Sequence, residues 1–138
     1  MNLHLEIITP EKIVYKDDVS EVTVKTDNGQ ISILPGHVNL LTKVLPCEMI
    51  VKKDNQEHFL AITGGFLEIN NNNLNLLADY AIRAEDIEIA KIQEAQKKAE
   101  NMIKDKASEK EFRVAEAELQ KALLQLHVAS KRGKRKTS

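Results

Sequence analysis

The fold is decided by the stretch Val22-Thr23-Val24-Lys25-Thr26-Asp27-Asn28-Gly29-Gln30-Ile31-Ser32-Ile33. Apolar residues occupy alternate positions on both sides of its centre, Val22 and Val24 before it and Ile31 and Ile33 after it. Alternation of this kind places the apolar side chains on one face of a β-strand. The Asn28-Gly29 step tolerates the positive φ that suits a tight hairpin turn. The stretch therefore predicts a β-hairpin with one face in a core.

The same two-residue period extends from Met1 to about Asp79. Its other apolar runs are Leu3 to Ile7, Met49 to Val51, Phe59 to Ile62, Phe66 to Ile69, and Leu74 to Leu77. Turn-forming residues separate them: Thr9-Pro10, Pro35-Gly36, Pro46, 53–55, Gly64-Gly65 and 70–73. Short strands without intervening helices favour an antiparallel sandwich over a parallel sheet, which needs helical crossovers. We predict an N-terminal antiparallel β-sandwich over residues 1–84.

The pattern changes after Asp79, where Gly and Pro disappear until Gly133 and helix-forming residues dominate. Acidic residues at 85, 86 and 88 suit the positive end of a helix dipole, so we expect a helix to begin there and to end near Asp105. Its apolar residues recur at three- and four-residue steps, which predicts one inward face. That face contains Ile92, Ala95, Ala99 and Met102.

A second helix is predicted from Ser108, because Ser108 followed by Glu111 fits a capping box. Its apolar seam contains Phe112, Ala115, Leu119, Ala122, Leu126 and Ala129. The short connection indicates an antiparallel two-helix hairpin over residues 85–138. Alanine at many seam positions lets the helix backbones approach closely but buries little apolar area, so we infer a hairpin that is able to open.

Composition excludes several classes of function. The chain has 138 residues, a formal charge of −1 and 4% aromatic residues, which argues against a globally basic nucleic-acid binder and against large aromatic pockets. Its one cysteine, Cys47, excludes an internal disulfide and is interpreted as a core residue. No stretch approaches the roughly 20 apolar residues that span a bilayer. The N-terminal residues show neither an export nor an import pattern.

No catalytic or metal-binding constellation is evident. The four histidines lack metal-ligand spacing, and His37, in a turn after Pro35-Gly36, is interpreted as a local hydrogen-bonding residue more readily than as a base. Gly64-Gly65 lacks the rest of a phosphate loop and is interpreted as a bulge or a close backbone approach. We predict no catalytic residues, no metal and no enzymatic activity.

The last segment is strongly basic, with five cations among residues 131–136. A solvated, frayed tail and a contact with an acidic protein surface are equally compatible with it. Nucleic acid is the weaker alternative, because the segment has no aromatic residue for base stacking.

The run from Gly29 to Thr42 resembles the signature loop and strand of the epsilon subunit of the F-type rotary ATP synthase. Gly64 to Ile69, Leu77 to Asp79 and Arg83 to Ile87 resemble the next blocks of this family in the same order, and Ala122 to Ala129 resembles its second helix. The resemblance covers essentially the whole chain. It implies a sandwich of about ten strands and two helices, the same organisation that the two periods predict.

The resemblance also implies a function. The chain would be a non-catalytic central-stalk subunit that couples rotation of the membrane-embedded c-subunit ring to the gamma shaft for ATP synthesis. Asn28, Gly29, Gln30 and Ile31 match the ring-contacting loop of the family, and His37 and Thr42 match positions near the gamma subunit. The chain would touch the membrane only indirectly, through the ring, at the cytoplasmic face of a bacterial inner membrane; a plastid is the less favoured location.

In many members of this family the hairpin extends along the shaft and inhibits ATP hydrolysis. Arg113, Lys121, Lys131 and Arg132 would then face acidic segments of the catalytic alpha and beta subunits. An ATP-binding motif that certain bacterial members carry on the hairpin is degraded in this chain, so we predict no bound nucleotide and no other cofactor. The alternative function is a generic adaptor, whose hairpin or tail binds an acidic protein or nucleic acid.

Overall fold

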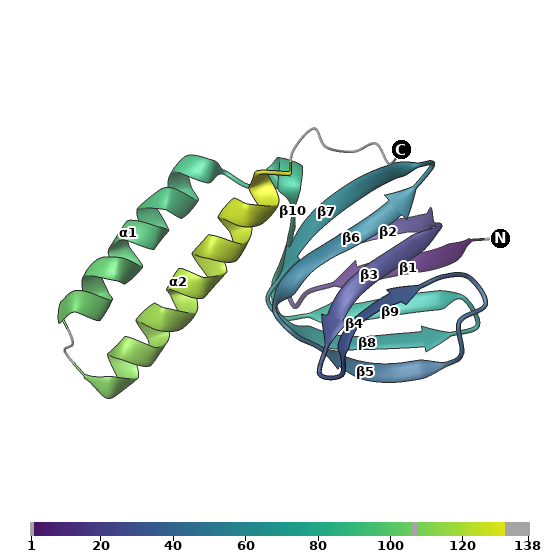
Figure 1. Ribbon diagram of the computed structural model, residues 1–138, viewed down its shortest axis with the longest axis horizontal. Helices are drawn as coiled ribbons and strands as arrows, with labels where there is room; N and C mark the ends of the chain where they lie inside the picture. The colour runs from purple at the N-terminus through teal and green to yellow at the C-terminus, as the bar shows by residue number, and fades with distance from the viewer. Residues whose placement is uncertain (1, 106–107, 132–138) are drawn as a thin grey trace.

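A computed structural model describes residues 2–105 and 108–131. Ten strands form a sandwich, and two antiparallel helices lie beside it as a hairpin (Figure 1). The strands are β1 Leu3–Ile8, β2 Ile13–Val19, β3 Glu21–Thr26, β4 Gly29–Ile33, β5 Leu40–Val44, β6 Cys47–Lys53, β7 Gln56–Ile62, β8 Gly65–Asn70, β9 Asn73–Ala78 and β10 Ala81–Arg83. A 3-10 turn, η1 (Ala84–Asp86), precedes α1 (Ile89–Asp105) and α2 (Glu109–Ala129). The predicted fold class, sandwich followed by helical hairpin, is confirmed.

The strands form two layers that are continuous at one corner. One layer runs β10-β7-β6-β3-β4 and the other runs β5-β8-β9-β1-β2, and the only pairing between β3 and β5 in the described chain is Thr26 with Val44. All pairs are antiparallel except β1 with β9, which are parallel. A parallel pair is possible here because most of the sandwich, instead of one crossover helix, connects the two strands. The predicted antiparallel character therefore holds for all pairs but one.

The β3–β4 hairpin forms where the sequence predicts it, with Thr26 opposite Gly29. The positive φ falls on Gly29 (φ 104°) and not on Asn28. The hydroxyl of Thr26 donates to the carbonyl oxygen of Gly29 (2.8 Å) and accepts from the backbone N–H of Asn28 (3.2 Å). The turn is thus fixed by a side chain as well as by the glycine.

The main core lies between the two layers and consists of the inward positions of the alternating strands, including Leu3, Leu5, Leu60, Leu67 and Leu76. Cys47 belongs to this core, and burial raises the pKa of its thiol, which is the structural role predicted for it. The close approach predicted at Gly64-Gly65 is also confirmed, because a Cβ on Gly65 would lie 2.1 Å from the carbonyl oxygen of Leu77.

The hairpin corrects two details of the prediction. The acidic residues Glu85 and Asp86 lie in η1, and α1 begins only at Ile89. The backbone of Ile87 is extended there, which directs its buried side chain towards the sandwich before the helix starts. A continuous helix from residue 85 would not place Ile87 in that position.

The inward face of α1 also differs from the predicted one. Ala99 is buried, but Ala95 and Met102 are exposed, and the neighbouring positions Gln96 and Ile103 are half-buried instead. The prediction followed apolar residue types, whereas the packing against α2 selects a face that includes a glutamine. The end of α1 at Asp105, the cap at Ser108 and the buried or half-buried seam of α2 are as predicted.

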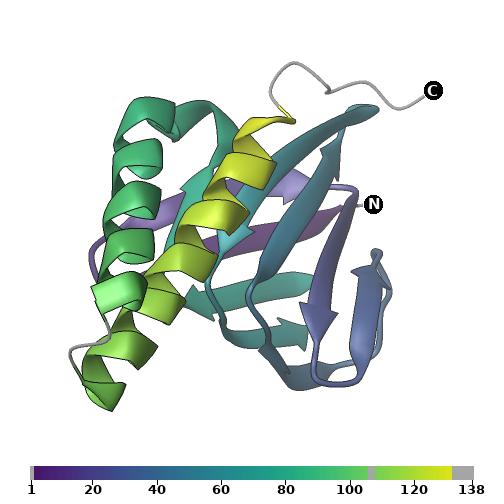
Figure 2. The same ribbon diagram turned by 60° about the vertical axis from the view of Figure 1, so that its left-hand side comes forward.

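The hairpin contacts the sandwich mainly through α2 and η1. The second half of α2 lies against the outer face of β6 and β7, while α1 lies on the side of α2 away from the strands (Figure 2). A second, smaller apolar cluster holds this contact: Phe59, Ala61, Ala84, Ile87, Val128 and Ala129, flanked by Ile50, Ile82, Ile92 and Leu124. The tip of the hairpin projects beyond the sandwich (Figure 1).

Candidate partner interface

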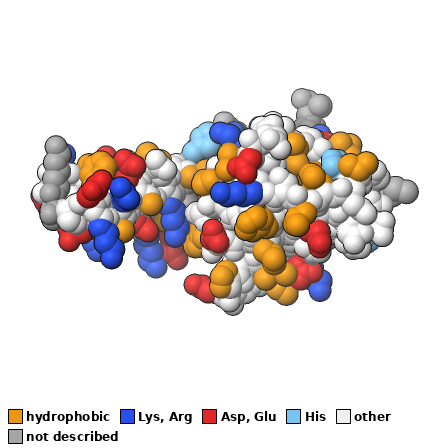
Figure 3. Space-filling view, turned by 90° about the horizontal axis from the view of Figure 1, so that it is seen from below, with side chains coloured by type: hydrophobic (Ala, Val, Ile, Leu, Met, Phe, Trp, Pro, Cys, Tyr) orange, Lys and Arg blue, Asp and Glu red, His pale blue; other side chains and the backbone are white. Residues whose placement is uncertain are grey.

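An apolar stripe crosses the outer face of the β5-β8-β9-β1-β2 layer. Strand register carries it across four strands, because Phe66 pairs with Leu77, Leu77 with Ile8, and Ile8 with Ile13. Leu41 on β5 adds to it beside Lys43, the partner of Phe66. Leu41 is 71% exposed, and Phe66 and Leu77 are each 58% exposed. Figure 3 shows apolar side chains gathered on the surface seen from the side of β5 and β8.

We call Ile8, Ile13, Leu41, Phe66 and Leu77 the apolar stripe; Ile8 is half-buried and the other four are exposed. Contiguous exposed apolar side chains on a folded protein indicate an interaction surface, because single exposed apolar residues are common but aligned ones are not. The stripe lies on the layer that does not hold the hairpin, so the chain presents two separate outer faces, one covered and one open.

This stripe is not among the features predicted from the sequence, although the sequence contains a signal for it. Several strands contain two adjacent apolar residues: Ile7-Ile8, Leu40-Leu41, Phe66-Leu67 and Leu76-Leu77. In a strand, neighbours point to opposite faces, so each doublet must place one apolar side chain outside the core. Four doublets in strands that lie side by side predict an apolar outer face.

The predicted ring-contacting residues lie on the β3–β4 hairpin. Asn28, Gly29 and Gln30 are exposed at its turn, whereas Ile31 is half-buried and packs against the main core. In the described chain β4 pairs only with β3, so this hairpin forms an edge of its layer. The structure thus exposes three of the four residues and uses the fourth for packing.

The two residues predicted near the gamma subunit occupy different environments. His37 is in the loop before β5, where its Nδ1 lies 2.7 Å from the carbonyl oxygen of Val38, so it is the local hydrogen-bonding residue that the sequence predicts. Thr42 lies on the inward side of β5, since it is paired with the buried Leu67. The outward neighbours of Thr42 are Leu41 and Lys43, and Leu41 belongs to the apolar stripe.

Each of the predicted hairpin contact residues that the structure describes has a partner within the chain. Arg113 is exposed and pairs with Glu109 one helical turn away (3.1 Å). The ammonium of Lys121 lies 3.9 Å from the centroid of the Tyr80 ring, and that of Lys131 lies 3.6 Å from a carboxylate oxygen of Glu48. Arg132 lies outside the described residues.

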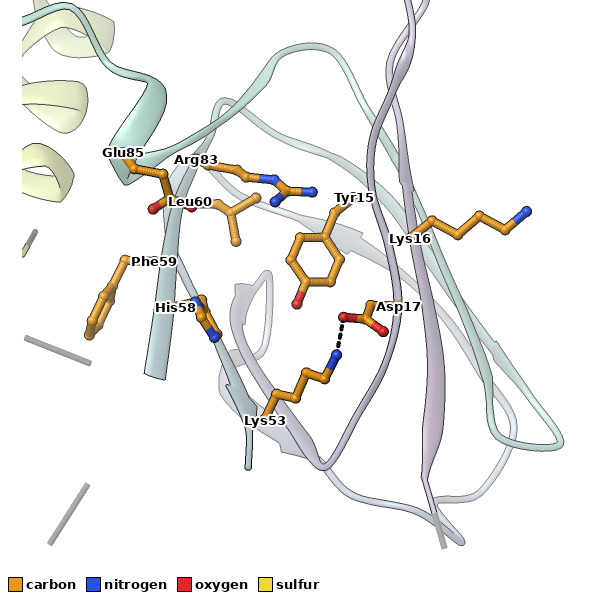
Figure 4. A pocket seen from close by; sticks show the side chains of 9 residues that line it. All are labelled: Tyr15, Lys16, Asp17, Lys53, His58, Phe59, Leu60, Arg83 and Glu85. Carbon is orange, nitrogen blue, oxygen red and sulfur yellow. Dashed lines mark hydrogen bonds and ion pairs between the residues drawn. The ribbon is translucent and has the colours of Figure 1, made fainter. Parts of the chain in front are cut away.

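A cavity of about 230 Å³ lies at the seam between β2 and the β10-β7-β6 edge (Figure 4). Nε and Nη2 of Arg83 donate to the carbonyl oxygen of Val14 (3.2 and 3.1 Å), and the Arg83 guanidinium lies 4.7 Å from the centroid of the Tyr15 ring. Lys53 forms an ion pair with Asp17. These cations are therefore paired with groups of the chain itself. Arg83 joins β10 to β2, the two ends of the strand order, and Lys53 joins β6 to β2.

The electrostatics of the seam follow from these contacts. Burial, followed by the nearby Asp17 carboxylate, raises the pKa of Tyr15. The hydrogen bond from Lys53 holds the pKa of Asp17 below its usual range. No group of three or more His, Cys, Asp or Glu side chains within residues 2–105 and 108–131 is arranged to hold a metal ion. None of the described helices is long and apolar enough to cross a membrane.

Family models match the chain along nearly its whole length. Residues 2–84 match the beta-sandwich domain of the ATP synthase delta/epsilon chain, and residues 85–130 match its long alpha-helix domain. The ATP synthase epsilon chain of Caldanaerobacter subterraneus subsp. tengcongensis is 40% identical over 129 residues, which cover 93% of this chain and 94% of that protein.

This chain belongs to the epsilon-chain family of ATP synthase. The family predicted from the run from Gly29 to Thr42 is therefore confirmed.

Chains from two solved ATP synthase assemblies share the fold at low sequence identity. A chain of the Euglena gracilis mitochondrial ATP synthase, from an assembly of OSCP, F1 and c-ring in rotational state 1, matches with a TM-score of 0.64 and 18% identity, over 94% of this chain and 78% of that one. A chain of the Tetrahymena thermophila mitochondrial ATP synthase, from its central stalk and c-ring, matches with a TM-score of 0.60 and 14% identity, over 94% and 97%.

Proposed function

We propose that this chain is a non-catalytic rotor subunit of an ATP synthase, which couples rotation of the c-subunit ring to the gamma shaft. Family membership over nearly the whole chain supports the assignment to the complex. The apolar stripe is the observation that supports a rotor role within the complex. A subunit that transmits torque needs a large surface that a neighbouring subunit binds firmly. Residues 1–84 form the rotor-binding part in this proposal, and residues 85–138 form the regulatory part.

The apolar stripe is the proposed interface with the gamma subunit. Burying exposed apolar side chains contributes about 25 cal/mol per Å², and a stiff sheet loses little conformational entropy when it binds. Leu41 and Phe66 lie on the stripe, with His37 and Thr42 close by in sequence on the loop before β5 and on β5 itself. We propose that these two sequence-predicted residues border the contact and that the stripe supplies most of its binding energy.

The β3–β4 hairpin is the proposed contact with the c-subunit ring. Asn28, Gly29 and Gln30 are exposed there, and their polar backbone and side-chain groups suit the polar loops at the surface of a membrane-embedded ring. Ile31 anchors the hairpin to the core from the other side. The chain thereby touches the membrane only through its partner, and the proposed location is the cytoplasmic face of a bacterial inner membrane.

The helical hairpin is the proposed inhibitor of ATP hydrolysis. Its contact with the sandwich depends on a small apolar cluster in which alanines are prominent, so it holds the hairpin with little buried area. Once extended, Arg113, Lys121, Lys131 and Arg132 would face acidic segments of the alpha and beta subunits. Deleting residues 85–138 should then raise the ATPase activity of the assembled enzyme; unchanged activity would remove this part of the proposal.

Co-purification tests the rotor assignment. We expect the wild-type chain to retain the gamma subunit and the c ring on an affinity column, and the Leu41→Ser/Phe66→Ser variant to lose gamma. The matched control is Val114→Ser/Leu123→Ser, which removes two exposed apolar side chains from α2 and should retain gamma. Retention of gamma by the stripe variant, or binding of an unrelated acidic protein or nucleic acid instead of gamma, would contradict the proposal.

A further inference from the structure

The last turn of α2 rests on the sandwich through a mixed apolar and charged contact. Val128 and Ala129 pack against Phe59 and Ala61 on the outer face of β7. On the neighbouring strand, β6, Glu48 points to the same outer face, because Cys47 and Met49 on either side of it point into the core. The carboxylate of Glu48 therefore lies at the edge of the contact between the hairpin and the sandwich.

Glu48 is an unusual group for such a position. Only 16% of its side chain is exposed, and its Oε2 accepts no hydrogen bond from any of the described residues. Two basic side chains from the end of the hairpin approach it. Nε2 of His127 lies 3.4 Å from Oε2, and Nζ of Lys131 lies 3.6 Å from Oε1. The Lys131 ammonium also lies 5.4 Å from the centroid of the Phe59 ring.

A shielded carboxylate without hydrogen bonds costs free energy unless a cation compensates for it. Both side chains belong to the hairpin, so the Glu48 carboxylate has the Lys131 ammonium beside it only while the end of the hairpin is docked. When the hairpin leaves, water replaces the helix over β6 and solvates the carboxylate. An apolar residue at position 48 would instead favour the docked hairpin, because exposing that residue to water would be unfavourable.

We propose that Glu48 is an electrostatic latch, which makes docking of the hairpin conditional on the ammonium of Lys131 at its end. With Lys131 in place the carboxylate is paired and the hairpin remains docked on the sandwich. When Lys131 is neutralised or binds another partner, the uncompensated charge of Glu48 favours release of the hairpin from the sandwich. The proposal depends only on contacts within this chain and stands whether or not the chain acts as a rotor subunit.

A thiol placed under the hairpin reports its release. Val128 is fully buried in the contact, and cysteine is smaller than valine, so Val128→Cys should be accepted without displacing the helix. The labelling rate of that thiol by a soluble maleimide in the full-length chain measures how often the hairpin leaves the sandwich. Native Cys47, buried in the main core, is the internal control, because its labelling rate measures opening of the sandwich itself. Proteolysis and mass spectrometry separate the two thiols.

In the Val128→Cys chain, Lys131→Met should raise labelling under the hairpin by about tenfold, with no change at Cys47, because it leaves a shielded carboxylate without its ammonium partner. In a Glu48→Gln background the same Lys131→Met change should alter labelling by less than about threefold, because the charge it compensates is gone. Lys121→Met is the matched control. It removes another cation of α2, one that contacts Tyr80 instead of Glu48, and its effect should be equal in both backgrounds.

Three results would overturn the latch. The first is no effect of Lys131→Met. The second is an equal effect with Glu48 and with Gln at that position, which would mean that Lys131 acts only through Phe59. The third is a parallel rise at Cys47, which would mean that the variant loosens the sandwich and not the hairpin contact.

Discussion

Arg83, the last residue of β10, donates two hydrogen bonds to the carbonyl oxygen of Val14 on β2, at 3.2 and 3.1 Å. β10 and β2 are the two ends of the strand order and do not pair through their backbones in the described chain. One guanidinium therefore connects strands that the sheet leaves apart. The Lys53–Asp17 pair and the hydrogen bonds from Ser20 to the Lys52 carbonyl oxygen (2.8 Å) close the same seam further along.

Removing the guanidinium should destabilise the sandwich. Arg83→Met keeps the aliphatic stem but leaves the partly buried Val14 carbonyl without its donors, and we expect a loss of about 1 to 3 kcal/mol in the free energy of unfolding. Urea unfolding followed by circular dichroism measures it. The control Arg113→Met loses only an exposed pair with Glu109 and should change stability by less than about 0.5 kcal/mol. Equal effects of the two substitutions would show that the seam contact contributes nothing.

Gly65 is required by space and not only by backbone conformation. In Gly65→Ala the new Cβ would lie 2.1 Å from the Leu77 carbonyl oxygen, so β8 and β9 would have to separate. We expect a loss of more than about 3 kcal/mol, or failure to fold. Gly36→Ala is the control, since Gly36 also has a positive φ (86°) but has open space around it; it should cost about 1 kcal/mol. Thermal melting of the two variants distinguishes the causes, and similar losses would rule out the steric account.

The Asp17–Lys53 pair should contribute to stability in a pH-dependent way. Its hydrogen bond lowers the folded-state pKa of Asp17, so the contribution is present above the unfolded aspartate pKa of about 3.9 and is lost as the pH falls through the folded-state pKa. Melting temperatures from pH 7 to pH 2 should therefore show wild type above Asp17→Asn near neutrality and the difference vanishing in acid. Asp27→Asn, in the exposed β3–β4 turn, serves as control. A difference that stays constant with pH would contradict the prediction.

The Ser108 cap should hold the start of α2. Its hydroxyl accepts a hydrogen bond from the Glu111 backbone N–H (3.0 Å), so Ser108→Ala should destabilise the hairpin locally by about 1 kcal/mol. Amide hydrogen exchange of residues 109–112 should accelerate, while exchange in the sandwich stays unchanged. Ser108→Asp retains an acceptor at the same place and should retain slow exchange; accelerated exchange in this variant too would argue against capping.

Local signals in the sequence predict much of the fold. Alternation around Val22 to Ile33 and the capping pair Ser108 and Glu111 depend on neighbours in the chain, and the structure has a hairpin and a helix start there. The alternation of apolar and polar residues does not predict three of the strands. β2 and β5 lack clear alternation, and β10 has only three residues. β2 carries a charged run from Lys16 to Asp18, and β5 has an apolar doublet, so neither has a simple period of two.

What the sequence by itself determined is therefore the type of most long elements, the change from strands to helices along the chain, the core role of Cys47 and the close approach at Gly65. These follow from residue periodicity and backbone sterics, which act over a few residues. The tertiary structure decided the parallel pairing of β1 with β9, the choice of Gln96 over Ala95 for the inner face of α1, the alignment of four apolar doublets into one stripe, and the placing of Glu48 beneath Lys131. Each of these depends on which distant segments meet, because burial and charge pairing are properties of neighbours in space and not of neighbours in sequence.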